Sequence, residues 1–291
     1  MSKTTQIFNS LANNRTGRAL LNLFGSNAPE NIKNLFGVTD SQMSSATGAG
    51  LSPTIWDSCP RGQMLIDPTV GHFVGDDFAF TSTKSYTTAY DYTLSQSNAG
   101  TFAATASDPN GVALITATET DNDAAYVNHA ANPGIVKLDA TKNWWYETRV
   151  KLGQITKAQG IFIGFTEHGT AMGTDFLTTN TMELKVQDSF GFQILSATDI
   201  AAVWQSCFTL AAKVVLDAAL ATATTGWVKL GMKSELGNIS IYVNGVVVAT
   251  TTTAATNFPL NKYMMPCFAN KTGQGTANAL SVDWWYAAQL R

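Results

Sequence analysis

The strand pattern near the C-terminal end of the chain constrains its fold more than any other feature. In residues 227–233 and 239–243, every second residue is apolar. The apolar positions are Val228, Leu230, Met232, Ile239, Ile241 and Val243. This period of two is typical of strands with one buried face. Asn244 and Gly245 then precede a third apolar run at 246–250, and Asn-Gly favours a tight hairpin because both residues tolerate positive φ.

The chain before this hairpin also reads as short strands separated by turns. We expect strands at residues 77–80, 85–94, 100–106, 112–118, 124–129, 144–152, 160–166, 190–195, 213–216 and 280–286. Only 13% of the residues are charged and 10% are aromatic, which suits strands better than surface helices. Strands at spacings of about 8–12 residues indicate an all-β sandwich or barrel. The longest break, at residues 169–187, is predicted to be a surface loop.

The first sixty residues differ from the rest. Three short amphipathic pieces precede a stretch at 38–52 that is rich in Ser, Thr, Gly and Ala. Their apolar residues are Ile7, Phe8, Leu11, Leu20, Leu21, Phe24, Ile32, Leu35 and Phe36. Isolated helices shorter than about 12–15 residues are marginal in water. We therefore divide the chain into an arm with short helices at 1–60 and a sandwich at 61–291, and we expect the arm to dock on a partner rather than on the sandwich.

Charge and hydropathy exclude several classes of protein. The net charge is −3 and no basic run occurs, so we expect no nucleic-acid partner. No apolar run approaches the about 20 residues that span a bilayer, so we expect no membrane contact. The N-terminus lacks the apolar core of a secretion signal, which indicates synthesis in a cytoplasm. Three widely spaced cysteines (Cys59, Cys207 and Cys267) are predicted to be reduced thiols.

Several of these segments resemble a known fold family. Residues 145–150, 160–165, 227–230 and 239–245 follow the strand order of concanavalin A-like and laminin-G-like jelly rolls, in which a Val-Asn-Gly hairpin lies in the second half. The resemblance implies a jelly-roll β-sandwich of two antiparallel sheets. The opening at 55–60 and the ending at 282–291 are similar to jelly-roll structural proteins of tailed bacteriophages, of the capsid-decoration or head-fibre type. That second resemblance implies a place on a virion.

The acidic residues do not form the pattern that hydrolases of this fold need. Glucanases require two carboxylates about 5–5.5 Å or about 6.5–9.5 Å apart, and on a strand these appear as acids at every second position. The nearest approach is Glu119, Asp121 and Asp123, but the polar residues around them favour a solvated turn. We therefore predict no catalytic residues and no cofactor. Asp121 and Asp123 remain weak candidates for a calcium site.

Two tryptophan pairs, at 144–145 and 284–285, invite a binding interpretation. Neighbouring strand residues point to opposite faces, so one member of each pair faces the core. The other member is predicted to lie at an interface or, as the alternative, to stack on a sugar. We assign this outward role to Trp145 and Trp285.

These inferences combine into one functional hypothesis. The protein is predicted to be a non-enzymatic virion structural protein, a capsid decoration protein whose arm binds the major capsid protein and whose copies also contact one another. The alternative is a lectin-like, carbohydrate-binding module of a tail fibre or spike, with a glycan as its ligand.

Overall fold

The structure is a computed structural model that describes residues 50–78, 92–104, 111–129, 134–157, 159–167, 176–178, 182–185, 187–196, 203–273 and 276–291. Two short helices, α4 (Pro53–Trp56) and α5 (Arg61–Ile66), precede the strands. The strands are β1 (Gly71–Asp76), β2 (Tyr92–Ser97), β3 (Thr101–Ala104), β4 (Ala113–Ala117), β5 (Ala124–His129), β6 (Val136–Lys137), β7 (Trp144–Leu152), β8 (Gln159–Glu167), β9 (Ser189–Ser196), β10 (Val203–Thr209), β11 (Lys213–Thr222), β12 (Val228–Glu235), β13 (Asn238–Val243), β14 (Val246–Thr252), β15 (Tyr263–Thr272) and β16 (Asn278–Leu290). In the part of the chain that the structure describes, no helix is long and apolar enough to cross a membrane.

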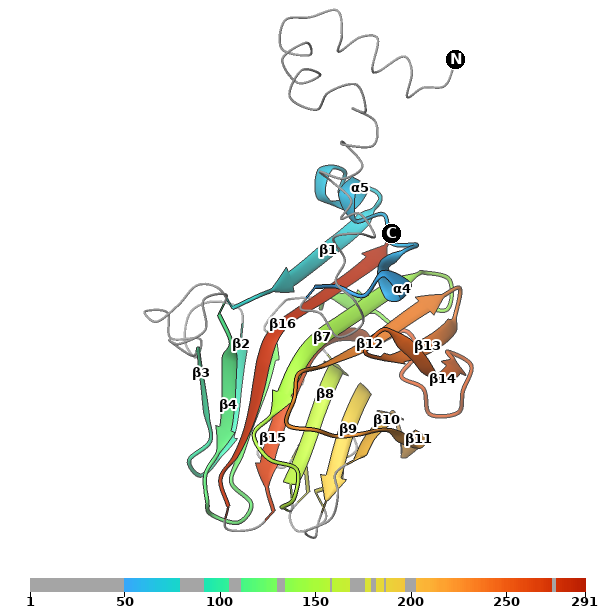
Figure 1. Ribbon diagram of the computed structural model, residues 1–291. Helices are drawn as coiled ribbons and strands as arrows, with labels where there is room; N and C mark the ends of the chain where they lie inside the picture. The colour runs from blue at the N-terminus through green and yellow to red at the C-terminus, as the bar shows by residue number, and fades with distance from the viewer. Residues whose placement is uncertain are drawn as a thin grey trace, which may run out of the picture.

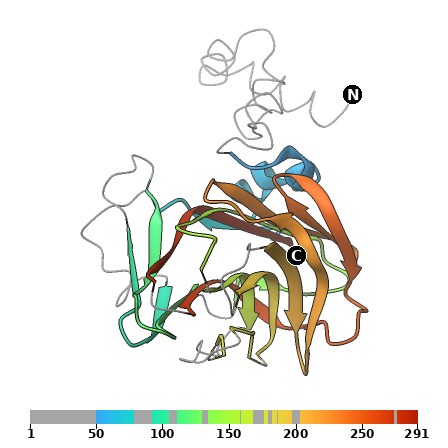
Figure 2. The ribbon, with the colours of Figure 1, turned by 60° about the horizontal axis from the view of Figure 1, so that its bottom comes forward.

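The strands form two antiparallel sheets that pack face to face (Figure 1). Sheet A runs β14-β13-β12-β7-β16-β4-β3, with β1 also paired to β16. Sheet B runs β11-β10-β9-β8-β15-β5-β2, with β6 also paired to β15. In Figure 2 the two helices, in blue, lie on the side of sheet A that faces away from sheet B. The predicted all-β sandwich of two antiparallel sheets is therefore confirmed.

The core fills the space between the sheets with side chains from alternate strand positions. The apolar residues that define the alternation in β12 and β13 all lie in it. Trp144 of β7 contacts Phe165 and Phe190 of sheet B edge-on, with ring centroids 6.1 and 6.0 Å apart. Asn244 and Gly245 adopt φ values of 50° and 76° between β13 and β14. The hairpin prediction is confirmed for the reason that the sequence suggested.

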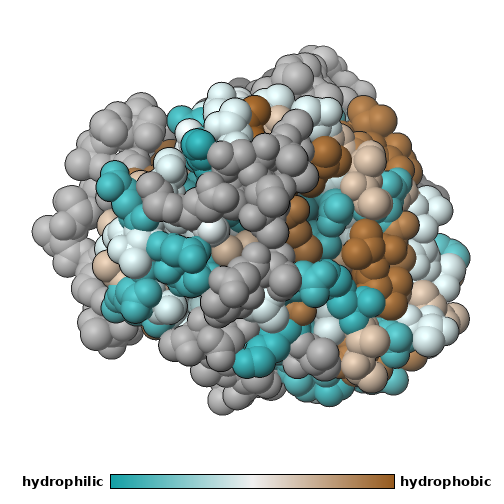
Figure 3. Space-filling view, turned by 90° about the horizontal axis from the view of Figure 1, so that it is seen from below, coloured by the Kyte–Doolittle hydropathy of each residue, from teal (hydrophilic) through white to brown (hydrophobic). Residues whose placement is uncertain are grey.

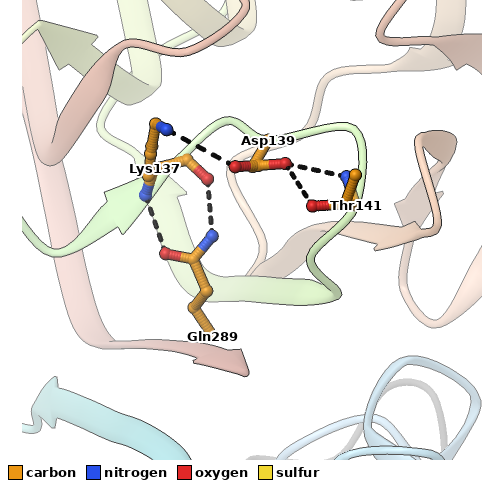
Figure 4. A network of polar contacts seen from close by, with 4 residues as sticks. All are labelled: Lys137, Asp139, Thr141 and Gln289. Carbon is orange, nitrogen blue, oxygen red and sulfur yellow. Dashed lines mark hydrogen bonds and ion pairs between the residues drawn. The ribbon is translucent and has the colours of Figure 1, made fainter. Parts of the chain in front are cut away.

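A side chain also connects the two sheets near the end of the chain. Gln289 of β16 accepts a hydrogen bond from the Lys137 backbone N–H (2.8 Å) and donates one to the Lys137 carbonyl (2.5 Å). Figure 4 shows this paired arrangement, together with the contacts of Asp139 to Lys137 and Thr141. Because β16 belongs to sheet A and β6 to sheet B, the Gln289 amide acts as a short bridge between them.

The edge strands β11 and β14 lie near each other on the same side of the sandwich. Each contains an irregularity: the β10–β11 register shifts on either side of Ser206, and the β13–β14 register shifts between Ile241 and Tyr242. Bulges of this kind twist an edge away from further strand pairing. The side chains of Val215, Val246 and Val247 are exposed there. In Figure 3 apolar residues gather on this side of the molecule.

Four strands lie where the alternation of apolar residues predicted none. They are β1 (71–76), β6 (136–137), β10 (203–209) and β15 (263–272). In β10 the side chains of Trp204 and Phe208 enter the main core, whereas Cys207 lies in a second cluster on the outer face of sheet B. A strand that is buried on both faces shows no clean alternation of apolar and polar residues, which explains why the pattern missed it.

Candidate functional site

The predicted outward tryptophans are both buried. Trp285 lies in the core between the sheets, where its Nε1 donates a hydrogen bond to the Tyr92 hydroxyl (2.7 Å). Trp145 lies on the outer face of sheet A, beneath Ile55 and Trp56. In this structure neither ring is open to a sugar. The predicted arm residues, from Ile7 to Phe36, lie outside the described residues.

A bulge in β16 corrects the assignment of the second tryptophan pair. The pairing of β16 with β7 shifts between Val282 and Trp284, which leaves Asp283 unpaired in the ladder. Before the bulge Val282 faces the core, and after it Trp285 does, so that Trp284 is the residue turned outward. The simple alternation that assigned Trp285 to the surface fails at this one extra residue.

The weak calcium candidates lie in a turn and differ in burial. Asp121 is exposed, while Asp123 is buried and accepts a hydrogen bond from Asn98 Nδ2 (2.7 Å). The Asp123 backbone N–H donates to the Thr120 carbonyl (3.1 Å), as in a tight turn. No group of three His, Cys, Asp or Glu side chains that could hold a metal ion occurs in the described ranges. The turn that the sequence favoured at this position is therefore observed.

The most elaborate polar site lies where residues 50–66, here called the strap, cover sheet A. The strap contains α4 and α5 and buries Ile55, Trp56, Cys59 and Met64 against the outer face of the sheet. The sequence divided the chain at residue 60, and the structure shows residues on both sides of that position packed on the same face. The described chain therefore joins the sandwich from Gly50 onward.

Glycines in sheet A make room for the strap. A Cβ added to Gly231 of β12 would lie 2.3 Å from Ile55 Cδ1, far closer than van der Waals contact, so a side chain there would displace Ile55. One added to Gly71 of β1 would lie 2.9 Å from Met64 Cε and 2.3 Å from the Gln289 carbonyl oxygen, so it would disturb the pairing with β16 as well as the strap. The sheet is thus shaped for the strap by the absence of side chains.

Glu147 of β7 lies at the centre of this contact. Its carboxylate is fully buried, and Oε2 accepts hydrogen bonds from the Ser52 backbone N–H (2.9 Å) and from Trp56 Nε1 (2.7 Å). Within the described residues, Oε1 accepts no hydrogen bond of normal geometry. Two of the strap's N–H groups therefore converge on one acid of the sheet. A buried carboxylate with one unpaired oxygen is costly, so its presence calls for an explanation.

The charges around Glu147 are positive. Burial raises the pKa of Glu147, and the contacts with Ser52 and Trp56 and the charge of Lys229 oppose that rise. The Lys229 ammonium donates to the Gly50 carbonyl (3.0 Å), and burial lowers the Lys229 pKa. Burial also lowers the pKa of Arg61, whose guanidinium lies 5.8 Å from the centre of the Trp56 ring. The strap is thus held by a buried acid between cations.

The cysteine of the strap is not a nucleophile. Burial raises the pKa of Cys59 to about 12, although the nearby Arg61 and Lys233 charges oppose the rise. The thiol therefore stays protonated at neutral pH, and the reactive thiolate is not formed. Cys207 and Cys267 are buried as well, and burial raises the pKa of each. The prediction of three free thiols is confirmed.

Beside the strap, the same sheet face carries an aromatic and cationic group of residues, here called the aromatic patch. It comprises Arg149, Lys151, Trp227, Trp284 and Tyr286. The guanidinium of Arg149 lies 4.5 Å, and the ammonium of Lys151 5.1 Å, from the centre of the partly exposed Trp227 ring. Trp284 and Tyr286 lie 5.7 Å apart. Arg149 also forms an ion pair with Asp283, the bulged residue of β16.

Two pairs of carboxylates approach each other closely, and each pair encloses a lysine. The Lys262 ammonium lies 2.8 Å from Glu167 and 2.6 Å from Asp188, and hydrogen bonds to these two residues raise its pKa. The Lys233 ammonium lies 2.9 Å from Asp57 and 3.0 Å from Glu235. In each pair the two carboxylates therefore share one cation.

Comparison with known proteins identifies the fold. No protein-family model and no curated protein matches the sequence. A structure of unknown function from Shewanella oneidensis MR-1 is 15% identical, with a TM-score of 0.53, over 84% of this chain and 97% of that one. Peanut lectin with a nine-residue peptide is 12% identical (TM-score 0.52; 76% and 99% covered). A family 16 glycoside hydrolase of Bacteroides ovatus, in complex with a product, is 11% identical (TM-score 0.51; 73% and 98% covered).

These likenesses define the class of the protein by its fold. The chain is an all-β protein with a concanavalin A-like, lectin-like jelly roll. The structures that share the fold include a lectin and a hydrolase, and their sequence identities are too low to transfer either activity. The sites of this chain must therefore be interpreted from its own residues.

The site around Glu147 was not found from the sequence. Glu147 and Lys229 occupy the positions of their strands that alternation assigns to solvent, and only a distant segment turns those positions into an interior. One local signal does precede the strap: Pro53 at the start of α4, directly after Ser52, is typical of a helix N-terminus. That signal predicts a helix, but it does not reveal what the helix covers.

Proposed function

We propose that the protein is a non-enzymatic structural module that is mounted on a larger assembly through its N-terminal arm. One observation carries this proposal. The strap that connects the arm to the sandwich is fastened to sheet A by the Glu147 carboxylate, the Gly50–Lys229 contact and the buried side chains of Ile55 and Trp56. A segment held in this way transmits force and orientation from the arm to the sandwich.

The assembly we propose is a virion, with the major capsid protein as the partner of the arm and further copies of the chain beside it. The support for this partner is the row of apolar residues in the arm sequence and the resemblance of residues 55–60 and 282–291 to virion jelly rolls. A ligand that binds the assembled shell stabilises it against dissociation by mass action. The described carboxylate pairs, each with a lysine between its members, support a role without catalysis.

The test compares the full chain with a variant that lacks residues 1–49. The truncation keeps the strap and all its contacts, so we expect a folded sandwich with an unchanged thermal transition. Both proteins are sedimented with purified capsid shells, and the bound fraction is measured. Binding of the full chain together with loss of binding by the truncated chain supports the proposal. Equal binding of both proteins, or binding of neither, contradicts it.

A second candidate function is glycan binding, and the aromatic patch favours it. A partly exposed tryptophan backed by two cations offers a flat ring of the kind on which sugars stack. Lysine and arginine beside the ring favour an acidic glycan over a neutral one. The likeness to a lectin fold is compatible with this function but does not specify a ligand.

The glycan candidate is tested on an array with wild-type protein and Trp227→Ala. The matched control is Tyr263→Ala, because Tyr263 is another exposed aromatic residue with a lysine, Lys137, 5.9 Å from its ring centre. Selective loss of a glycan signal in Trp227→Ala supports binding at the patch. No signal with the wild-type protein, or equal signals from all three proteins, contradicts it.

A further inference from the structure

We propose that the strap is a proton-linked latch, in which docking on sheet A takes up a proton at Glu147, so that the strap closes more tightly in acid and loosens toward neutral pH. The latch rests on the proposed function, because it makes the attachment of the sandwich through the strap tighter in acid than at neutral pH. It is carried by the contacts between the strap and the sheet, however, and can be tested without any partner.

The geometry makes Glu147 dependent on the strap for its burial. On the outer face of sheet A its cross-strand neighbours are Gly231 of β12 and Tyr286 of β16. Gly231 has no side chain with which to shield the carboxylate, and Ile55 of the strap fills that space instead. Removal of the strap would therefore expose the carboxylate to water and return it to an ordinary environment. Docking and protonation are coupled because only the docked state withholds solvent from the acid.

The unpaired oxygen provides a place for the proton. Oε2 is already engaged by Ser52 and Trp56, whereas Oε1 accepts no hydrogen bond of normal geometry from the described residues. Protonation at Oε1 removes the buried charge and leaves both hydrogen bonds to Oε2 in place. The Ser52 hydroxyl is buried beside the carboxylate, and its interaction with Glu147 opposes the rise in pKa that burial causes.

The charged groups that face Glu147 come from three elements. Lys229 belongs to β12, Arg149 to β7 and Arg61 to α5, and Tyr286 of β16 is the adjacent titratable side chain. The charge of Lys229 favours the ionised carboxylate, and Arg61 also interacts with it, yet burial raises the pKa of Glu147. Burial raises the pKa of Tyr286 further above its ordinary value, so that it remains neutral in this range. These groups keep a constant charge while Glu147 titrates.

The direction of the pH effect follows from this raised value. With the strap open Glu147 has an ordinary carboxyl pKa of about 4.3. Since its pKa is higher with the strap closed, closing is favoured at low pH and the advantage is lost as pH rises through the raised value. His72 of β1 has the opposite sign, because burial lowers its pKa, so that its protonation opposes the folded state in acid. A latch effect is thus distinguishable from the histidine effect by its direction.

The experiment is hydrogen exchange of the full chain between about pH 5 and pH 8, with rates corrected for the intrinsic effect of pH on exchange. We expect backbone amides of residues 50–66 to gain protection as pH falls, by up to about tenfold for each pH unit between the two carboxyl pKa values. Amides of β8 and β15, in the middle of sheet B, should show no such trend. Unchanged protection of the strap over this range contradicts the latch.

Two variants locate the effect at Glu147. Glu147→Gln keeps an oxygen for Ser52 and Trp56 and removes the titration, so its strap should be protected equally at all pH values. The matched control is Glu235→Gln, which alters an acid at the rim of the strap that contacts Ser58 and should leave the trend intact. If Glu147→Gln retains the wild-type pH trend, the proposal is wrong. If Glu147→Gln does not fold, Trp56→Phe is used instead. This variant keeps an aromatic ring and removes the hydrogen bond from Trp56 to Glu147. The pH trend of strap protection must then move to higher pH.

Discussion

The outer faces of the two sheets are covered in different ways. On sheet B an apolar cluster that includes Tyr126, Phe162, Phe176 and Leu177 covers the face. On sheet A the strap covers part of the face through a buried carboxylate and glycine-lined slots, and the aromatic patch occupies the other part. The two covers are therefore held by different interactions: apolar contacts on sheet B, and a hydrogen-bonded carboxylate beside apolar contacts on sheet A.

This difference has consequences for stability. Apolar contacts do not depend on pH, and they are strengthened by every additional atom that they remove from water. A buried acid contributes little net stability and can impose a dependence on protonation. The cover of sheet B is thus expected to behave as part of the core, whereas the strap on sheet A is expected to open as a separate unit.

The largest expected effect concerns the sheet B face. Phe162 is fully buried and lies 5.5 Å, between ring centres, from Phe176. Phe162→Ala should lower the free energy of unfolding by about 3–5 kcal/mol because it leaves a large cavity. The matched change on sheet A is Met64→Ala, which should increase exchange within the strap and leave the global transition nearly unchanged. Urea denaturation and hydrogen exchange measure the two outcomes. If Met64→Ala lowers the global free energy of unfolding more than Phe162→Ala does, the two faces do not differ in the way proposed.

An intermediate effect is expected where the sheet makes room for the strap. Gly231→Ala places a Cβ 2.3 Å from Ile55 Cδ1, so Ile55 has to move. Overpacking of this kind costs about 1–3 kcal/mol, and we expect the cost to fall on strap docking alone. Limited trypsin digestion at Arg61 should accelerate while the thermal midpoint of the sandwich is kept. Gly226→Ala serves as the control, since the nearest atom to its Cβ, Thr224 Oγ1, is 3.4 Å away. Equal rates of digestion at Arg61 in both variants would contradict the view that the space above Gly231 is needed for strap docking.

The sequence predicted the part of the fold that alternation encodes. The β13–β14 hairpin and the inward residues of β12 follow from a local period of two, and β5 and β7 lie where short strands between turns were expected. The sequence also favoured the turn at Asp121 and Asp123 over a metal site. In each of these cases the determining residues are neighbours in the chain.

The features that the sequence did not predict depend on distant or irregular contacts. Glu147 and Lys229 occupy outward strand positions, and the strap buries them from about 80 residues or more away in the chain. In β16 the bulge at Asp283 reverses the orientation of Trp284 and Trp285, and the residues around it carry no Gly or other signal for a bulge. A local pattern contains neither kind of information.

The smallest expected effect concerns the rim of the strap and separates it from the buried centre. Asp57 forms an ion pair with Lys233 (2.9 Å), but the Asp57 side chain is 62% exposed and Lys233 retains Glu235 as a second partner. Exposed pairs contribute about 0.2–1 kcal/mol, and salt screens them. Asp57→Asn should therefore change strap protection by less than about fivefold. Hydrogen exchange at low and high salt measures this. A loss of protection well above about fivefold would mean that the rim, and not the buried carboxylate, holds the strap.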